Sequence, residues 1–286
     1  MYRILFALLW LITLLPLRVL YLLSDFLYPI LYYVVGYRKN VVRGNVEKSF
    51  PDKTEKERLL IERRFYRFFC DLFVETLKQL HFSPAEMSRR ITFGNVNLVL
   101  EQYNRGKSIM LMTSHYANWE WISSMSMYLP ADKALHPIYK RLTNKGSDLL
   151  MNKLRSKYGG TNIEKNNLLR TMLRMKSKGQ LGAFGMVSDQ TPIRKFQFCL
   201  EFLNQKTPML TGTEELAKKF DYPVFYAKLT RVKRGYYHCD LIPISMEPKE
   251  TIEYEITGKY MSELEKQILE TPHLWLWTHK RWKYVR

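Results

Sequence analysis

The chain has 286 residues, 46% of them hydrophobic, and carries 45 Lys and Arg against 27 Asp and Glu, a formal net charge of +18. This composition excludes a disordered or low-complexity chain and allows a sizeable core in one or two domains. So basic a balance predicts an anionic partner, which would be nucleic acid, an anionic bilayer or a phosphorylated substrate. Three distant cysteines, Cys70, Cys199 and Cys239, predict neither a disulfide framework nor a zinc module and fit a reducing compartment.

The chain begins with a long apolar stretch. Residues 4–36 contain only two charged side chains, Arg18 and Asp25. One continuous helix of this length would extend about 50 Å, more than the roughly 30 Å hydrocarbon core of a bilayer. We therefore expect residues 1–36 to form a membrane anchor, either a tilted span with an interfacial turn or a spanning helix whose end lies in the headgroups. The alternative is a cleaved signal peptide, but no small-x-small cleavage site follows the stretch.

Basic residues come soon after this stretch, at Arg38, Lys39 and Arg43. The positive-inside rule therefore places the remainder of the chain in the cytoplasm, against an anionic leaflet. No linker is long or flexible enough to separate a second soluble domain. We expect residues 37–286 to form a single domain.

Helical patterns recur through this domain. Thr54 and Glu57 have the spacing of a capping box, and apolar residues at helical spacing continue from there to Leu80. Ser83 followed by Pro84 is a second helix start. Further helices are predicted at residues 96–103, 145–158, 166–178, 211–220 and 252–269.

Short apolar runs between the helices predict strands. These lie at residues 109–112, 136–140, 182–188, 223–230 and 236–244. The alternation of strands and helices predicts an α/β fold with a mixed, partly parallel sheet, helices on both faces and an antiparallel hairpin late in the chain. Residues 190–207 are rich in aromatic side chains and are expected to form a loop.

The run at residues 109–112 leads into the stretch with the clearest chemical content. A polar turn follows it, and a second apolar run begins at Trp119, for which Asn118 is a suitable N-cap. His115 should then lie just past the end of a strand, and Glu120 in the first turn of the next helix. In open α/β sheets, ligands bind at the carboxyl ends of the strands.

His115 and Glu120 are five residues apart. On one continuous helix they would point about 140° apart, but across a strand–turn–helix junction the carboxylate can reach the ring. Glu120 would accept a hydrogen bond from one ring nitrogen and leave the other as a general base, while N–H groups at the helix start could stabilise an oxyanion. The alternative is a chance pairing. A metal site is not predicted, because no second His or Cys lies nearby.

The segment from His115 to Glu120, His-Tyr-Ala-Asn-Trp-Glu, resembles the H-x4-D/E motif of membrane acyltransferases. Its Asn-Trp-Glu form is similar to the branch that contains the late lipid A (lauroyl/myristoyl) acyltransferases. Residues 45–51, 187–190 and 275–283 agree with the same family in the same order, so the resemblance covers nearly the whole chain.

The resemblance implies a membrane-bound O-acyltransferase at the cytoplasmic face of the bacterial inner membrane. It would transfer a fatty acyl chain from a thioester of acyl carrier protein or CoA, with no other cofactor, to a hydroxyl of a lipid A precursor. Acceptors of other kinds stay open, namely a lysophospholipid, an aminolipid or another glycolipid. A non-enzymatic, membrane-anchored protein that binds anionic lipid or nucleic acid is the alternative of another class.

Three further polar residues are candidates. Arg155 and Asp189 resemble an Arg and an Asp that line the family's active site and help to hold the acceptor or the donor. A guanidinium suits a phosphate or an oxyanion, and Asp189 could orient Arg155 or a sugar hydroxyl. Lys140, just after a predicted strand, could contact a phosphate. The alternatives are a solvated Arg155, a solvated Lys140 and an Asp189 that caps a turn.

The chain ends with Trp275, Trp277 and Trp282 among basic residues. Such a segment could bind single-stranded nucleic acid by stacking and charge. With an anchor at the other end of the chain, we favour an interfacial belt at headgroup depth over a nucleic-acid surface. The partners that the resemblance implies are the bilayer, an anionic lipid substrate and a carrier protein, without nucleic acid. No nucleophile elbow, Cys–His pair or glycine-rich phosphate loop is present, so direct transfer through a base is the mechanism that remains.

Overall fold

The computed structural model describes residues 8–192, 196 and 198–284. Its strands are β1 (Ile91–Gly94), β2 (Ile109–Thr113), β3 (Leu135–Tyr139), β4 (Ile163–Glu164), β5 (Ala183–Val187), β6 (Cys199–Phe202), β7 (Gln205–Pro208), β8 (Val224–Lys233) and β9 (Tyr236–Ser245). Seven of them form one sheet in the order β1-β9-β8-β2-β5-β3-β4. Neighbours are parallel except in the β8–β9 hairpin, so the sheet is mixed, as predicted.

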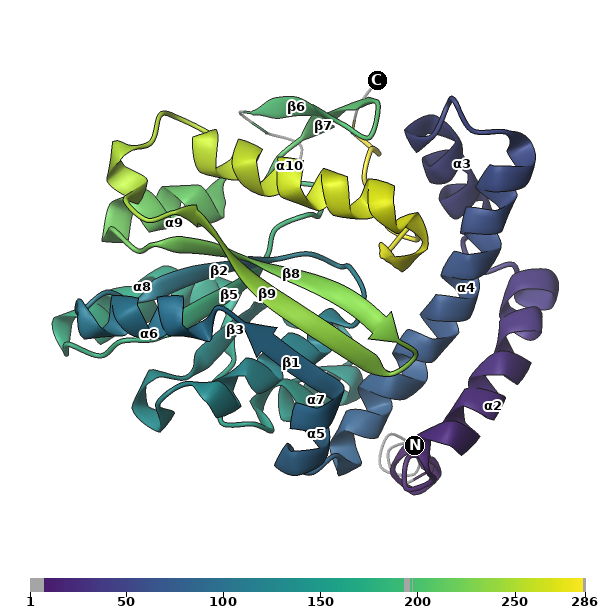
Figure 1. The fold of residues 1–286 in the computed structure, drawn as a ribbon, viewed down its shortest axis with the longest axis horizontal. Helices are drawn as coiled ribbons and strands as arrows, with labels where there is room; N and C mark the ends of the chain where they lie inside the picture. Colours follow the sequence, from purple (N-terminus) through teal and green to yellow (C-terminus); the bar gives the residue numbers. More distant parts are fainter. Residues whose placement is uncertain (1–7, 193–195, 197, 285–286) are drawn as a thin grey trace.

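The helices lie around this sheet. The longer ones are α2 (Leu17–Pro29), α3 (Lys39–Ser49), α4 (Glu55–Lys78), α5 (Pro84–Arg90), α6 (Val96–Asn104), α7 (Lys145–Ser156), α8 (Leu168–Ser177), α9 (Gly212–Phe220) and α10 (Glu255–Glu270). Figure 1 shows α9 and α10 above the sheet, α5, α6 and α7 below it, and α4 and α2 along one end. The protein is therefore an α/β fold.

Other helical segments are short or irregular. They are the π-helix η1 (Ile30–Val35) and the 3₁₀ segments η2 (Gln79–His81), η3 (Trp119–Tyr128), η4 (Ala131–Lys133), η5 (Lys165–Asn167), η6 (Pro248–Glu250) and η7 (Pro272–Leu274). The predicted helix at Trp119 is thus the 3₁₀ segment η3, and Asn118 makes no capping hydrogen bond to it. Asn118 thus occupies the predicted N-cap position, but its side chain does not cap the segment: the amide nitrogen donates to Glu75 on α4, and Oδ1 has no partner among the described residues.

Strand β2 lies in the centre of the sheet. All five of its residues are buried, as expected for a strand covered on both faces. Burial on both faces therefore explains why β2 is apolar. The polar residues that follow it mark the point where the chain leaves the sheet. The site described below begins there.

Helix α4 supports both the sheet and the N-terminal segment. Its capping box is formed as predicted, with the Glu57 amide donating to the Thr54 hydroxyl and the Thr54 amide donating to the Glu57 carboxylate. Helix α2 packs along α4 in the view of Figure 1. Tyr32 on η1 donates a hydrogen bond to Glu62 of α4 at 2.8 Å. The N-terminal segment is consequently attached to the rest of the fold along its length.

The apolar N-terminal stretch is not one continuous helix. Residues 8–12 are helical, Pro16 is extended, and α2 starts after it. The segment Leu17–Val35 is the one described helix that is long and apolar enough to cross a membrane, with 19 residues and a mean hydropathy of 1.3. It ends at Gly36, which adopts φ +61°, a left-handed conformation that favours glycine. Residues 1–7 of the predicted anchor lie outside the described residues.

The prediction of a loop at residues 190–207 is wrong in its second half, where β6 and β7 form a hairpin. Its two turn residues, Leu203 and Asn204, both have positive φ. Hairpin turns of this kind usually carry Asn-Gly or a similar pair, and a leucine at the first position conceals the signal. The short strands β1 and β4 and the helix α3 were also not predicted, because they are brief or carry no clear apolar period.

Candidate active site

The ends of two neighbouring strands bring His115 and Asp189 together. Strands β2 and β5 are parallel, and Thr113 at the end of β2 pairs with Val187 at the end of β5. His115 and Asp189 each lie two residues beyond these partners, so the register of the sheet places them side by side. This is the carboxyl edge of the parallel strands, where ligands bind in open α/β sheets.

Asp189 holds both the ring and the backbone of His115. The His115 ring donates from Nδ1 to Asp189 Oδ1 at 2.6 Å, and the His115 amide donates to Oδ2 at 2.9 Å. The Trp275 indole also donates to Oδ2, at 2.9 Å. Burial alone would raise the pKa of Asp189, but the charge and hydrogen bonds of His115 and the Trp275 indole outweigh it, so the pKa is lowered. Asp189 is therefore held as a carboxylate that orients the imidazole.

The second ring nitrogen of His115 points to the accessible side. Gln190 Nε2 lies 3.0 Å from His115 Nε2, and the His115 side chain is 15% exposed. An amide nitrogen donates and does not accept, so this contact favours a ring with its proton on Nδ1 and a lone pair on Nε2. His115 thus has the tautomer that a general base requires, with Nε2 as its basic atom.

Glu120 lies in the first turn of η3, as predicted, but its carboxylate does not bind the His115 ring. Its carboxylate accepts two hydrogen bonds from Arg155, from Nε at 2.7 Å and Nη2 at 2.6 Å, and a third from the Trp119 indole at 3.1 Å. Among the described residues, no hydrogen bond or ion pair joins Glu120 to the His115 ring. The expected pairing is corrected: a bidentate guanidinium outcompetes an imidazole for this buried carboxylate, and Asp189 already holds Nδ1.

The Glu120–Arg155 pair is linked to the imidazole through Trp119. The Trp119 ring that donates to Glu120 also meets the His115 ring edge-on, with centroids 5.0 Å apart. Arg155 comes from the last turn of α7, and its pKa is raised, because the Glu120 charge and hydrogen bonds outweigh the lowering by burial. The two groups form a neutralised pair on one side of the base.

Of the remaining candidates, Asp189 contacts the His115 ring, whereas Lys140 does not take part in the site. Asp189 orients His115, and the expectation that it would orient Arg155 is wrong for that reason. Lys140 follows β3 at the same carboxyl edge of the sheet, but its side chain is exposed and makes no hydrogen bond or ion pair with the described residues. The structure therefore brings His115, Asp189, Glu120 and Arg155 together and leaves Lys140 apart.

The C-terminal segment backs the turn that carries His115. Tyr116 and Trp275 form an antiparallel bridge, the Ala117 amide donates to the Leu274 carbonyl at 2.9 Å, and the Leu276 amide donates to the His115 carbonyl at 3.0 Å. Trp275 is thus a site residue that sequence reasoning missed, as is Gln190. Both lie within stretches that resemble the acyltransferase family, which was the available signal.

The expected interfacial belt of tryptophans is contradicted for two of its members. Trp275 is 2% exposed and Trp277 is 0% exposed, so both belong to the core. Arg281 is also fully buried and donates from Nη2 to the Pro208 carbonyl at 2.8 Å, and burial lowers its pKa to about 10. The pattern of aromatic and basic residues resembled a membrane belt, but Trp277 packs beside Trp275 and Phe50. Trp275 and Arg281 contact the β6–β7 hairpin.

No group of three or more His, Cys, Asp or Glu side chains among the described residues could hold a metal ion. The site contains an imidazole held by a carboxylate, with a guanidinium–carboxylate pair linked to it through Trp119. A proton can be taken up at Nε2 of His115, and the cation of Arg155 can attract developing negative charge.

No curated protein sequence matches the chain. The profile of the bacterial lipid A biosynthesis acyltransferase family matches residues 2–284, almost the full length. The chain belongs to the bacterial lipid A biosynthesis acyltransferase family.

Proposed function

We propose that this acyltransferase moves a fatty acyl chain from a thioester of acyl carrier protein or CoA to a hydroxyl of a lipid A precursor, with His115 as the general base. The observation that carries the proposal is the hydrogen bond between His115 Nδ1 and Asp189, which leaves Nε2 as the proton acceptor. The family match supports a lipid A acceptor over the other lipids considered above.

The reaction proceeds by direct transfer. The acceptor hydroxyl takes the place of the Gln190 amide at Nε2 and gives its proton to the ring. Its oxygen attacks the thioester carbonyl carbon, and the tetrahedral intermediate expels the thiolate, which takes the proton back from the imidazolium. The products are an ester and a free thiol, and Asp189 stabilises the transient imidazolium.

Arg155 assists from the side of the base. Its Nε and Nη2 are bound to Glu120, so Nη1 is the guanidinium nitrogen not engaged in that pair. We propose that Nη1 donates a hydrogen bond to the developing oxyanion or to a phosphate of the acceptor. Glu120 holds the guanidinium in place, which explains why a carboxylate is useful at this position without contact to the imidazole.

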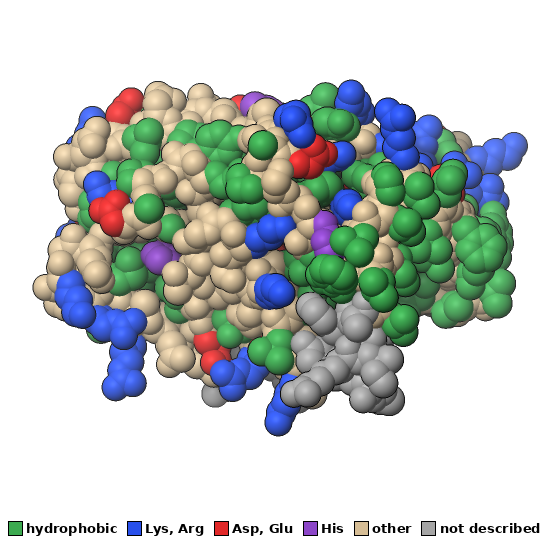
Figure 2. Space-filling view, turned by 90° about the horizontal axis from the view of Figure 1, so that it is seen from below, with side chains coloured by type: hydrophobic (Ala, Val, Ile, Leu, Met, Phe, Trp, Pro, Cys, Tyr) green, Lys and Arg blue, Asp and Glu red, His purple; other side chains and the backbone are tan. Residues whose placement is uncertain are grey.

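The proposed location is the cytoplasmic face of the inner membrane. Helix α2 turns Leu22, which is 69% exposed, and Phe26, which is 64% exposed, away from the protein. Figure 2 shows hydrophobic side chains gathered at the end of the molecule where α2 lies. An exposed apolar patch of this kind marks an interaction site, and a bilayer that holds the lipid acceptor is the partner the family match favours.

A pocket beside the C-terminal segment supports an anionic acceptor. Its walls hold Lys48 of α3 together with Lys280 and Lys283, and no carboxylate from the described part of the chain lines it. Lys280 is close in sequence to Leu276, whose amide contacts the His115 backbone. We propose that this pocket binds a phosphate of the acceptor lipid. Its three lysines would then account for part of the net charge of +18.

The experiment that tests the function is mass spectrometry of lipid A from cells that lack this chain. We expect a species short by one acyl group, restored by the intact chain and not by the His115→Ala variant at equal membrane abundance. Unchanged lipid A in the deletion strain would contradict the substrate assignment. Full restoration by the His115→Ala variant would contradict the base.

A further inference from the structure

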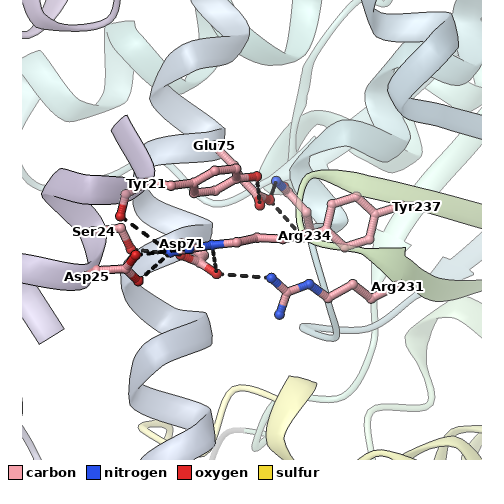
Figure 3. A network of polar contacts seen from close by, with 9 residues as sticks. Tyr21, Ser24, Asp25, Asp71, Glu75, Arg231, Arg234 and Tyr237 are labelled. Carbon is pink, nitrogen blue, oxygen red and sulfur yellow. Dashed lines mark hydrogen bonds and ion pairs between the residues drawn. The ribbon is translucent and has the colours of Figure 1, made fainter. Parts of the chain in front are cut away.

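A buried carboxylate on α4 connects three distant parts of the chain. Glu75 is 0% exposed, and it accepts hydrogen bonds from Tyr21 of α2 at 2.7 Å, Tyr237 of β9 at 2.7 Å and Asn118 at 3.0 Å. Burial raises its pKa, and the three donors act in the opposite direction. Figure 3 shows Tyr21 and Tyr237 converging on Glu75 from opposite sides. A buried carboxylate is costly, so three donors on it point to a specific role.

Asn118 connects Glu75 to the catalytic turn. It lies three residues after His115 and two before Glu120, and its amide nitrogen donates to Glu75 Oε2 while its Oδ1 has no partner. The residue before it, Ala117, has φ +49°, a left-handed conformation that costs free energy for a residue other than glycine. Such a conformation persists only when its surroundings hold it. The Leu274 carbonyl holds the turn from one side, and Glu75 holds it from the other.

Helix α2 is attached to the same face of α4. One turn from Glu75, Asp71 accepts a hydrogen bond from Ser24 at 2.8 Å and forms an ion pair with Arg231 at 3.0 Å. Arg234 bridges Asp71 and Asp25 (Figure 3). These contacts seat α2 with its apolar side chains directed outward, so that Tyr21 can reach Glu75.

We infer that Glu75 is a positioning residue that couples the seating of α2 on α4 to the geometry of the catalytic turn. Tyr21 supplies one of its three donors. Without that donor, Oε1 of the buried carboxylate loses its hydrogen bond and the carboxylate rotates. Its bond to Asn118 then weakens, and the strained turn relaxes. The α2 helix then affects acyl transfer through Glu75 although it contacts neither His115 nor Asp189. As a statement about rate, the inference rests on the proposed function; as a statement about the turn, it does not.

The chain offers a matched pair of variants. Tyr21→Phe and Tyr32→Phe each remove one phenolic hydroxyl. Each of these hydroxyls donates a hydrogen bond from the N-terminal segment to a buried glutamate of α4. The partner of Tyr32 is Glu62, which pairs with Arg43 and has no contact with the turn. Both variants keep the ring, and we expect similar small losses in thermal stability. Only Tyr21→Phe should lower kcat, by about tenfold with little change in KM.

Hydrogen exchange provides a readout that does not depend on activity. Peptides that contain residues 115–120 should exchange faster in Tyr21→Phe than in the wild type, and at the wild-type rate in Tyr32→Phe. The effects of Tyr21→Phe and Asn118→Ala on kcat should be non-additive, because both act through Glu75. Equal exchange in the two tyrosine variants, or additive effects, would overturn the coupling. Faster exchange in Tyr21→Phe would support the coupling even if the acceptor proved to be another lipid.

Discussion

Of the carboxylates near the turn that carries His115, Asp189 and Glu120 lie on the side of its ring, and their partners decide what each can do. Asp189 accepts from the His115 ring, the His115 amide and the Trp275 indole. Glu120 is held by the Arg155 guanidinium, which is charged at every physiological pH. Asp189 is therefore the group that orients the base, and Glu120 fixes a cation beside it.

Removing the guanidinium should cost stability. In Arg155→Ala the Glu120 side chain, which is 8% exposed, would lose its ion pair, and we expect the free energy of unfolding to fall by about 2–3 kcal/mol. Denaturant unfolding of the purified protein in detergent measures this change. The control is Arg89→Ala, which breaks a pair whose arginine is 70% exposed and should cost less than about 1 kcal/mol. Equal losses in the two variants would show that Glu120 does not depend on Arg155.

The identities of these residues could be predicted from the sequence, but their pairing could not. His115, Glu120, Arg155 and Asp189 all stand out by motif. The partner of His115 depends on the β2–β5 register, which joins residues 74 positions apart and leaves no local pattern. The spacing of five residues between His115 and Glu120 favoured the nearer carboxylate, and the 3₁₀ geometry of η3 directs that carboxylate to α7 instead.

Among the elements, the C-terminal segment most clearly has a structural role. It runs antiparallel to the turn at Tyr116 and places Trp275 on Asp189. Trp277 packs in the core, with its ring centroid 4.8 Å from that of Trp275 and 5.9 Å from that of Phe50. The segment therefore contributes to the free energy of folding and to the shape of the site.

A pair of aromatic substitutions separates core packing from membrane contact. Trp277→Ala should lower the free energy of unfolding by about 3–5 kcal/mol and leave the affinity of the folded protein for anionic vesicles unchanged. Phe26→Ala, on the exposed face of α2, should weaken vesicle binding and change stability by less than about 0.5 kcal/mol. Denaturation and vesicle sedimentation measure the two quantities. The reverse pattern would restore the interfacial belt and contradict the membrane-facing role of α2.

Element prediction succeeded where periodicity was strong. The capping box at Thr54 and the buried run of β2 each predicted an element that the structure confirms. It failed where tertiary contacts decide: the two-residue strand β4 exists only because β3 pairs with it, and the β6–β7 turn requires positive φ at Leu203. Burial of Trp277 likewise depends on packing partners far away in the chain.

For the whole molecule, apolar and basic surfaces are separated in a way that suits a lipid substrate. The apolar patch lies over α2, and the lysine-lined pocket lies between α3, β7 and the C-terminal segment. A second pocket, between α8 and α9, also contains lysines, but its Lys107 is paired with Asp221 at 3.0 Å and with Glu247 at 3.1 Å. The first pocket is therefore the better place for an anion.

Substitution in the first pocket should affect recognition of the phosphate. The double variant Lys280→Ala, Lys283→Ala should raise KM for a phosphorylated acceptor about tenfold, with little change for the same acceptor after phosphatase treatment. Lys249→Ala in the second pocket is the control and should change neither value. An equal rise in KM for both forms of the acceptor would contradict a phosphate site. A rise in KM for the carrier protein alone would assign the pocket to the donor.

The central claim is that Asp189 sets the tautomer of a His115 base. The most direct measurement is the acyl transfer rate of Asp189→Asn, with acyl carrier protein as donor and a lipid A precursor as acceptor. We predict that kcat falls about 10²- to 10⁴-fold while KM for the acceptor stays within about threefold, because the ring loses the partner that fixes its proton on Nδ1. A kcat within about threefold of the wild type, in a variant with wild-type thermal stability, would contradict the claim.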